Sequence, residues 1–504
     1  MINPLFEKLF IKHENSDRKF LSFRDESFLT YGEFIRMVYK FAVSFRALGL
    51  EPGDRVALKL EKNQFFLGIY GACIHQGLIF LPINENYTAE ETSFFLRDSQ
   101  TRLFVTTRKE AESLSESADS YFQIETLENN GTGTLSSFAD SQKGPTITKD
   151  RNLQDVAALL YTSGTTGRPK AAMITHENLI SNVETLSEYW RFTAEDILIH
   201  ALPVYHTHGL FVATNIILFS EASMFFLKKF DAETILNLIP KSTTIMGVPT
   251  YYSRLLETSK LSKELTKGLR LVISGSAPLT KELSDWFFEK TGKRILERYG
   301  MTETNMISSN PYTGNRKSGT VGFPLPGIKL RICDPETGIN LPIGKVGEIE
   351  LKGKNVFKGY WGLPEKTREN FRPDGFFRTG DLGKFDTEGF LEISSRLKDL
   401  IITGGLNVYP KEVEKALDSY PEIKESAVIG LRHFDFGEAV VAVIVGNIGI
   451  GDLDSDYLET YLEGKLAKYK RPKAYIFQNT LPRNPLGKVL KNLLREKYTN
   501  FFNK

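Results

Sequence analysis

The chain has 504 residues, enough for about three domains of ordinary size. Hydrophobic residues make up 41% and charged residues 25%, which excludes wholesale disorder and collagen-like or disulfide-scaffold classes. The 64 Lys and Arg residues balance 62 Asp and Glu residues, and a net charge of +2 argues against general nucleic-acid binding. Cys73 and Cys333 lie too far apart in sequence for a C-x-x-C motif, so they predict neither a metal site nor a disulfide framework.

No segment of the sequence predicts a membrane span or a signal peptide. The longest apolar stretch, residues 439–445 with their flanks, is far short of the roughly 18 residues that would suggest a span. Charged residues interrupt the apolar residues of the N-terminus, which has no small-residue cleavage site. We therefore predict a soluble cytoplasmic protein without a membrane or nucleic-acid partner and without an obligate protein partner.

The first hundred residues alternate between strand and helix patterns. Capping boxes at residues 30–33 and 88–91 predict two helix starts, and the apolar residues 65–76 predict a third helix. Short apolar runs at residues 55–60, 79–83 and 103–107 predict the strands between them. This alternation indicates a parallel sheet with helices on its faces. Residues 128–150, rich in Gly, Ser, Thr and Asn, are expected to form an exposed connector.

The pattern changes twice in the second half of the chain. The α/β alternation continues to about residue 332, and shorter strands with Gly and Pro turns follow to about residue 393. A compact α+β unit then begins, with a helix starting at Pro410 and strands at residues 426–431 and 439–445. We predict an α/β fold: a large N-terminal domain of α/β subdomains plus a β-rich subdomain (1–395), a hinge (396–399) and a small mobile α+β C-terminal domain (400–504).

The most informative segment is residues 161–170, Tyr-Thr-Ser-Gly-Thr-Thr-Gly-Arg-Pro-Lys, which follows an apolar strand at residues 156–160. Its glycines allow a ligand to approach the backbone, its hydroxyls and consecutive N–H groups favour anions, and Lys170 adds a positive charge. The segment lacks the G-x-x-x-x-G-K-[ST] pattern of a Walker loop. These properties predict a polyphosphate-binding loop, for which the alternative is a polar surface turn.

This decapeptide resembles the phosphate-binding signature of acyl-adenylate-forming enzymes, which include acyl-CoA synthetases, luciferases and peptide-synthetase adenylation domains. Further matching stretches occur in the expected order at residues 299–303, 378–381, 395–399, 404–405 and 482–488. The resemblance covers essentially the whole chain. It departs at Ala171 and Ser395, where the family commonly has glycine, and neither departure removes a catalytic group.

The resemblance implies that a carboxylate and MgATP give an acyl-adenylate and pyrophosphate, after which a thiol displaces AMP. It implies that Thr166, Glu303 and Lys488 are catalytic, with Thr166 and Glu303 near Mg²⁺ and Lys488 at the substrate carboxylate and the α-phosphate. Lys398 would be the hinge pivot. Tyr299 would stack on adenine. The nucleotide-binding residues that the resemblance implies are Thr162, Ser163, Gly164, Thr165, Thr166, Gly167, Lys170, Ser276, Ala277, Pro278, Tyr299, Gly300, Thr302, Asp381, Arg396 and Lys488.

Residues 201–210, 246–254, 274–277 and 295–305 resemble malonyl-CoA synthetases more than fatty-acid or aryl-acid ligases. This resemblance implies that Arg254 and Ser276 bind the second carboxylate of the acid. Arg298 is a second candidate, unless it pairs with a neighbouring carboxylate of the protein, and His206 and His208 are expected to line the acyl pocket or its gate. A fatty-acyl pocket would leave a buried cation unpaired, whereas a dicarboxylate would pair with it. The expected substrates and cofactors are ATP, Mg²⁺, coenzyme A and malonate or a related small dicarboxylate.

Three other interpretations remain. A CoA ligase for a short monocarboxylate or an aryl acid predicts that Arg254 faces solvent, and an adenylation enzyme that loads a carrier protein would need that carrier in trans. A decayed nucleotide site would lack Asp381, Glu303 and Lys488, which are all present. A zinc site at His200, His206 and His208 lacks good ligand spacing and a fourth partner. The sequence does not separate malonate from methylmalonate, and the basic residues 468–473 predict either a CoA contact or a solvated face.

Overall fold

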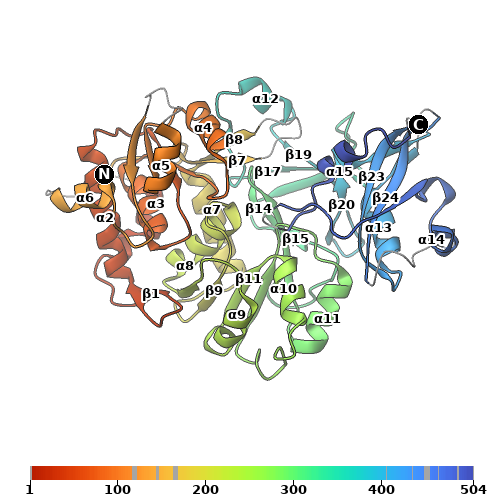
Figure 1. Cartoon of the computed structure of the whole chain (residues 1–504), viewed down its shortest axis with the longest axis horizontal. Helices are drawn as coiled ribbons and strands as arrows, with labels where there is room; N and C mark the ends of the chain where they lie inside the picture. The colour runs from red at the N-terminus through yellow and green to blue at the C-terminus, as the bar shows by residue number, and fades with distance from the viewer. Residues whose placement is uncertain are drawn as a thin grey trace. The chain divides into compact units, whose positions relative to one another are not determined.

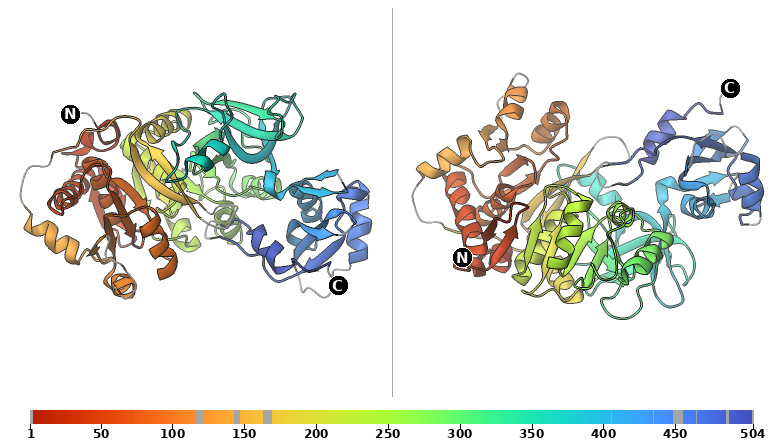
Figure 2. Two further views of the ribbon diagram at one scale, coloured as in Figure 1. Left: turned by 90° about the horizontal axis from the view of Figure 1, so that it is seen from above. Right: turned by 60° about the horizontal axis from the view of Figure 1, so that its bottom comes forward.

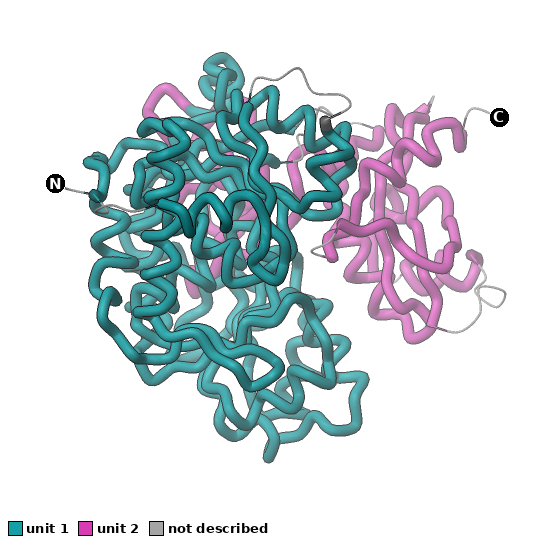
Figure 3. The backbone as a smooth tube through the Cα atoms, turned by 60° about the vertical axis from the view of Figure 1, so that its left-hand side comes forward, with its two compact units in different colours: residues 1–329, 352–371 teal, residues 330–351, 372–504 magenta. Residues whose placement is uncertain are grey.

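The computed structural model describes residues 3–115, 122–142, 147–162, 169–404, 406–433, 435–447, 455–463, 465–484 and 487–502. The chain divides into two compact units, which Figure 3 shows in different colours. Unit 1 comprises residues 1–329 and 352–371, and unit 2 comprises residues 330–351 and 372–504. The predicted α/β class is confirmed, with large α/β sheets in unit 1 and smaller β-rich and α+β parts in unit 2.

Unit 1 is built on two large, mostly parallel sheets (Figure 1). In spatial order the first sheet contains β18 (Gly359–Tyr360), β8 (Lys170–Thr175), β7 (Val156–Thr162), β4 (Ile79–Pro82), β3 (Arg55–Lys59), β5 (Leu103–Thr106) and β6 (Gln123–Thr126). The second contains β15 (Phe323–Pro324), β14 (Asn305–Ser309), β13 (Leu296–Met301), β12 (Leu271–Ser274), β11 (Thr244–Gly247), β9 (Ile197–His200), β10 (Ser223–Phe226), β1 (Lys19–Ser22) and β2 (Phe28–Thr30).

Helices cover both sheets, as the two views in Figure 2 show. The helices of unit 1 are α1 (Pro4–Leu9), α2 (Tyr31–Ala47), α3 (Gln64–Gln76), α4 (Ala89–Asp98), α5 (Arg108–Ser115), α6 (Thr134–Ser141), α7 (His176–Tyr189), α8 (Asn215–Ser220), α9 (Ala232–Leu238), α10 (Pro249–Leu256), α11 (Lys281–Thr291) and α12 (Pro364–Glu369). Shorter turns are η1 (Ile11–His13), η3 (Ile239–Lys241) and a π-helix, η2 (His208–Thr214). Helix α7 lies between the sheets, because it contacts β8 of the first and β14 of the second.

The local signals predicted most of these elements. Thr30 and Glu33 form both hydrogen bonds of a capping box at the start of α2, and Thr88 and Glu91 do the same at α4. The expected connector at residues 128–150 is wrong in part. Residues 134–141 form α6, where Leu135 and Ala139 are buried, so two apolar side chains stabilise a helix in a segment of turn-forming composition.

Unit 2 contains a four-stranded sheet and a five-stranded α+β sheet. The first has the order β16 (Lys329–Cys333), β17 (Gly347–Lys352), β19 (Phe377–Phe385) and β20 (Leu391–Arg396). The second contains β22 (Leu406–Val408), β21 (Ile401–Thr403), β24 (Gly437–Gly446) and β23 (Ile423–His433), with β25 (Ala474–Phe477) parallel to β24. Its helices are α13 (Pro410–Asp418), α14 (Ser455–Glu463) and α15 (Lys491–Lys497), with short turns η4 (Leu397–Asp399) and η6 (Lys468–Lys470). The predicted helix start at Pro410 is confirmed.

Candidate active site

Several predicted acid-binding residues follow parallel strands of the second sheet. His206 and His208 follow β9, and Ser276 follows β12, while Arg298 lies within β13. Because β9, β11, β12 and β13 are parallel neighbours, their carboxyl ends lie at one edge of the sheet. Ligands of open α/β sheets bind at such edges. We use the name acid pocket for these four residues alone: His206, His208, Ser276 and Arg298.

Arg298 is buried but has no ionic partner in the described part of the chain. Its side chain is 3% exposed, and its Nε and Nη2 atoms have no hydrogen-bond acceptor. The guanidinium packs against the backbone of Gly275, where an added Cβ would lie 2.4 Å from Cζ. Burial lowers the pKa of Arg298 to about 9. The predicted alternative, an ion pair with a neighbouring carboxylate, is therefore wrong.

His206 and His208 lie near enough to Arg298 to be affected by its charge, and Ser276, whose backbone is strained, contacts His208. Ser276 has a left-handed backbone with φ +69°, and its Oγ lies 3.2 Å from Nδ1 of His208. The His208 backbone N–H donates to Nδ1 of His206 at 3.3 Å. Desolvation, followed by the charge of Arg298, lowers the pKa of His206 to about 4 and lowers that of His208 strongly. Nε2 of His208 is buried without a partner. Strained backbone and unsatisfied polar atoms are characteristic of functional sites.

Arg254 lies apart from these contacts. It is on an exposed face of α10, where its guanidinium lies 5.8 Å from the centroid of the Phe230 ring. It makes no hydrogen bond or ion pair with the acid pocket among the residues that the structure describes. The cation that the structure buries beside Ser276 is Arg298. A carboxylate-binding role for Arg254 stays a prediction.

The predicted phosphate and metal ligands converge on Tyr360. Lys170 begins β8, and its Nζ lies 5.1 Å from the centroid of the Tyr360 ring. The Tyr360 hydroxyl donates to Oε1 of the buried Glu303 at 3.0 Å. Tyr360 was not predicted, because it reaches Glu303 only through the pairing of the two-residue strand β18 with β8. Lys170, Glu303 and Tyr360 thus place a cation and a carboxylate around one aromatic ring.

Several other predicted nucleotide residues can be placed. Tyr299 and Gly300 lie in β13, and an added Cβ at Gly300 would lie 2.0 Å from the Asn305 carbonyl oxygen, so only glycine fits there. Thr302 follows in the turn to β14, while Ala277 and Pro278 follow Ser276, with Pro278 exposed. Thr162 ends β7 and pairs with Lys170. Ser163, Gly164, Thr165, Thr166 and Gly167, as well as Gly405, lie outside the described residues.

Asp381 and Arg396, two predicted nucleotide-binding residues of unit 2, pair directly with each other. Asp381 of β19 and Arg396 of β20 are opposite residues in the sheet register, and Arg396 Nε lies 2.6 Å from Asp381 Oδ1. Lys398 follows in η4 and is exposed, whereas Asp399 binds Arg495 of α15 at 2.6 Å. Two ion pairs therefore flank the predicted hinge residue.

Lys488 is presented by a tight turn of unit 2. Its backbone N–H donates to Asn484 Oδ1 at 2.9 Å, and its carbonyl accepts from the Asn484 N–H at 2.9 Å. Gly487, with φ +79°, supplies the left-handed residue of this turn. Although the side chain keeps exposed surface, partial desolvation and then the charge of Arg396 lower the pKa of Lys488 to about 8. Asp381, Lys398 and Asp399 also act electrostatically on Lys488, so these predicted residues lie near one another.

Two further features that the sequence suggested, the basic residues 468–473 and a zinc site at His200, have other contacts in the structure. In the basic cluster, Lys470 pairs with Glu412 at 2.6 Å and Arg471 with Glu459 at 3.0 Å, so part of its charge is already neutralised. Nδ1 of His200 contacts Lys62 and Nε2 contacts the Gly209 carbonyl, which argues against a zinc site with His206 and His208. No group of three His, Cys, Asp or Glu side chains suited to a metal occurs in the described ranges.

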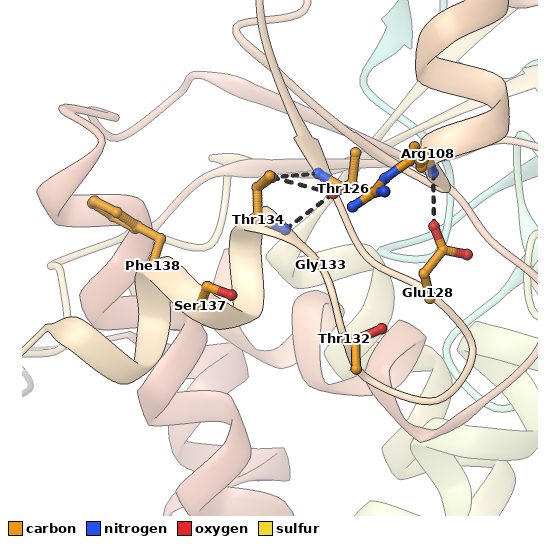
Figure 4. A pocket seen from close by; sticks show the side chains of 8 residues that line it. All are labelled: Arg108, Thr126, Glu128, Thr132, Gly133, Thr134, Ser137 and Phe138. Atoms are coloured by element: carbon orange, nitrogen blue, oxygen red, sulfur yellow. Dashed lines mark hydrogen bonds between the residues drawn. The ribbon is translucent and has the colours of Figure 1, made fainter.

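A separate surface hollow of about 780 Å³ lies beside α5, β6 and α6 (Figure 4). Its polar groups already bind one another: Thr126 and Thr134 exchange backbone-to-side-chain hydrogen bonds at 2.8 and 3.0 Å, and Glu128 accepts from the Arg108 N–H at 2.8 Å. We therefore do not place the active site there. Across the described ranges, no helix combines the length and apolarity that crossing a bilayer requires.

The sequence matches two family models. Residues 11–361 match the model described as AMP-binding enzyme, and residues 412–488 match the AMP-binding enzyme C-terminal domain. A malonate–CoA ligase from Arabidopsis thaliana is 33% identical over 491 residues, which cover 90% of this chain and 80% of that protein. A long-chain-fatty-acid–CoA ligase from Bacillus subtilis is also 33% identical, over 522 residues that cover 96% of this chain and 92% of that protein.

The solved structures include similar proteins at higher identity. The crystal structure of ATP-bound MatB from Rhodopseudomonas palustris is 48% identical, covers 100% of both chains and has a TM-score of 0.97. The matched models extend over most of the chain and agree with the order of the motifs at residues 161–170, 299–303, 378–381 and 482–488. The chain belongs to the AMP-binding enzyme family.

Proposed function

We propose that the protein ligates malonate, or a closely related small dicarboxylate such as methylmalonate, to CoA. ATP would activate the acid as an acyl-adenylate with release of pyrophosphate, and the CoA thiol would then displace AMP. Curated relatives of equal identity include ligases of malonate and of long-chain fatty acids, so overall identity does not identify the acid. The chemistry of the acid pocket supports a dicarboxylate.

The observation that carries the proposal is the buried, unpaired guanidinium of Arg298. Leaving a charge buried without a partner is unfavourable by several kcal/mol, so a protein keeps such a group where a ligand neutralises it. The free carboxylate of malonate supplies that charge and offers the two oxygens that a guanidinium fork binds. Ser276 and His208 lie beside it as neutral hydrogen-bonding groups. A fatty-acyl or aryl chain would leave Arg298 unpaired.

The exposure of Arg254 is the result expected for a ligase of a monocarboxylic or aryl acid. The exposed Arg254 therefore favours a monocarboxylic or aryl acid, whereas the buried Arg298 favours a dicarboxylate. We give Arg298 more weight because its burial has an energetic cost that a ligand must offset, whereas an exposed arginine is solvated whatever the substrate. The carrier-loading alternative differs only in the acceptor thiol, which the acid pocket does not determine.

For the nucleotide half, we propose the roles that the resemblance assigns. Lys170 would neutralise the leaving phosphates, Asp381 would accept from the ribose hydroxyls, and Lys488 would stabilise the charge that develops between carboxylate and α-phosphate. Glu303 is the described carboxylate that would hold Mg²⁺; it is buried, and its Oε1 accepts from the Tyr360 hydroxyl. Bound Mg²⁺ would supply charge neutralisation of the polyphosphate.

The test measures AMP formation with ATP and CoA across acetate, malonate, methylmalonate, succinate and octanoate. We expect malonate to be the best acid, methylmalonate to be accepted less well, and acetate and octanoate to be poor, since both lack a second carboxylate. Malonate should also support exchange of pyrophosphate into ATP without CoA. Octanoate or acetate as the best acid would reject the dicarboxylate proposal, and an exchange that requires CoA would reject the adenylate order.

A further inference from the structure

Lys62 is a second buried cation of unit 1, and no carboxylate of the described chain pairs with it. It lies between β3 and α3 and is 6% exposed. Its Nζ donates to the carbonyl oxygens of His200 at 2.7 Å and Leu202 at 2.9 Å, and lies 2.9 Å from Nδ1 of His200. The Phe226 ring packs 4.4 Å from the ammonium. The three hydrogen-bond contacts, to His200 and Leu202, lie on the segment of residues 200–209, which carries His206 and His208.

The contacts of Lys62 determine which nitrogen of His200 carries the proton. Burial lowers the pKa of Lys62, but three acceptors around Nζ match the three donors of an ammonium group. If Lys62 donates to Nδ1, the imidazole carries its hydrogen on Nε2. That N–H then donates to the Gly209 carbonyl at 2.8 Å. If Lys62 were neutral and accepted a hydrogen bond from Nδ1–H, Nε2 would carry no hydrogen. The lone pair of Nε2 would then face a lone pair of the Gly209 carbonyl oxygen.

Gly209 connects this chain of hydrogen bonds to the acid pocket. It is the second residue of the π-helix η2, directly after His208. Its carbonyl also accepts from the Thr214 hydroxyl at 2.9 Å, and an added Cβ at Gly209 would lie 2.0 Å from the Pro203 carbonyl oxygen. Lys62 thus binds the start of the 200–209 segment directly and its end through one imidazole. Single π-helical turns occur frequently at functional sites, where they re-aim side chains.

We propose that Lys62 is a positioning residue for acid recognition: through His200 it fixes the 200–209 segment and so the orientation of His206 and His208 in the acid pocket. The inference rests on the proposed function, which places the acid beside these histidines. It assigns Lys62 and His200 no contact with substrate.

The experiment compares Lys62→Met, His200→Leu and His200→Gln with the parent enzyme. For each variant the KM of the acid, the KM of ATP and kcat are measured with the best acid of the panel. We expect Lys62→Met and His200→Leu to raise the acid KM about tenfold or more while the ATP KM stays within about twofold, since each removes a hydrogen bond to a charged or buried group. His200→Gln should restore most of the affinity, because its amide can accept from Lys62 and donate to Gly209.

Lys59→Met is the matched control. Lys59 is another buried lysine of the same strand end, 4% exposed, but it binds the Tyr87 carbonyl at 2.6 Å, the Thr92 hydroxyl at 3.1 Å and the Glu110 carboxylate. Lys59→Met should lower the unfolding temperature without raising the acid KM more than the ATP KM. Combining Lys62→Met with His208→Ala should raise the acid KM by less than the product of the single effects, because both changes affect the same contact, that of His208 with the acid.

Two results would overturn the proposal. One is an equal effect of Lys62→Met and Lys59→Met on the acid KM; the other is an equal loss in His200→Gln and His200→Leu. If Lys62→Met does not fold, the two His200 variants decide the question. Acetate or octanoate as the best acid would reject the proposed function, but the Lys62 comparison would still be made with that acid and would be decided separately.

Discussion

Arg298 and Arg254 differ in how far their guanidinium groups are hydrated, which determines how strongly each can bind an anion. Arg298 is buried, and its Nε and Nη2 have no hydrogen-bond partner among the described residues, whereas Arg254 is exposed. We expect Arg298→Met to lower kcat/KM for malonate by about a hundredfold or more, because the second carboxylate would enter a pocket with no cation. Arg254→Ala should lower it by less than about tenfold, since an exposed charge is already solvated.

A stability measurement separates this role from a structural one. Because Met fills a similar volume without a charge, Arg298→Met should unfold no earlier than the parent protein in the absence of the acid. Addition of malonate should raise the unfolding temperature of the parent and not that of the variant. If Arg254→Ala were the more damaging change, the acid-binding cation would be Arg254, as the sequence resemblance implied.

At the scale of elements, the short turn η4 and the turn that carries Lys488 have separable tasks. The Asp381–Arg396 and Asp399–Arg495 ion pairs fix the residues on both sides of Leu397 and Lys398. We therefore expect a change of backbone angles in this segment to fall mainly on these two residues. Proline at position 398 would fix φ near −65° there and restrict Leu397 as well. Lys488, in contrast, is the residue that we propose stabilises charge at the reacting phosphate.

We therefore predict opposite defects in two variants. Lys488→Ala should abolish malonate-dependent pyrophosphate exchange but still convert supplied malonyl-adenylate and CoA to product. Lys398→Pro should form the adenylate but transfer it poorly, because the resemblance implies that this residue pivots between the two half-reactions. Each half-reaction is measured separately, with Lys411→Ala as a control lysine that binds the Ile393 carbonyl at 3.0 Å. Equal loss of both half-reactions in both variants would contradict a pivot at residue 398.

How much the sequence predicts depends on the range of the interaction that forms each element. Capping boxes and apolar periods are local, so α2, α4 and the start of α13 follow from a few neighbouring residues. Helix α6 was missed because packing of Leu135 and Ala139 outweighs a turn-forming composition. The Tyr360–Glu303 contact and the Lys62–His200 pair join residues 57 and 138 positions apart. No local pattern shows such pairs, and even the resemblance gave Arg298 second place to Arg254.

At the scale of the whole molecule, the histidines make unit 1 sensitive to acid. His13, His75 and His176 are each about 1% exposed, and burial lowers the pKa of each from 6.5 to about 4. Between these values the unfolded chain binds protons that the folded unit does not, so their contribution to stability is complete above pH 6.5 and falls as the pH drops towards 4. Together they should lower the free energy of unfolding by about 4 kcal/mol between pH 7 and pH 5.5.

This acid sensitivity can be measured in unit 1 by itself, because the three tryptophans, Trp190, Trp286 and Trp361, all lie there. Urea unfolding followed by tryptophan fluorescence should show the midpoint fall between pH 7 and pH 5.5. His200, His206 and His208 of unit 1 also have lowered pKa values, so six buried histidines contribute to the loss. His176→Gln removes a buried ring whose Nδ1 has no partner among the described residues, and it should reduce the pH-dependent loss by about one sixth. His433→Gln, which changes a histidine of unit 2, is the control and should leave the loss unchanged. A midpoint that did not depend on pH over this range, or one that His176→Gln left as steep as in the parent, would show that these imidazoles accept protons within the folded unit.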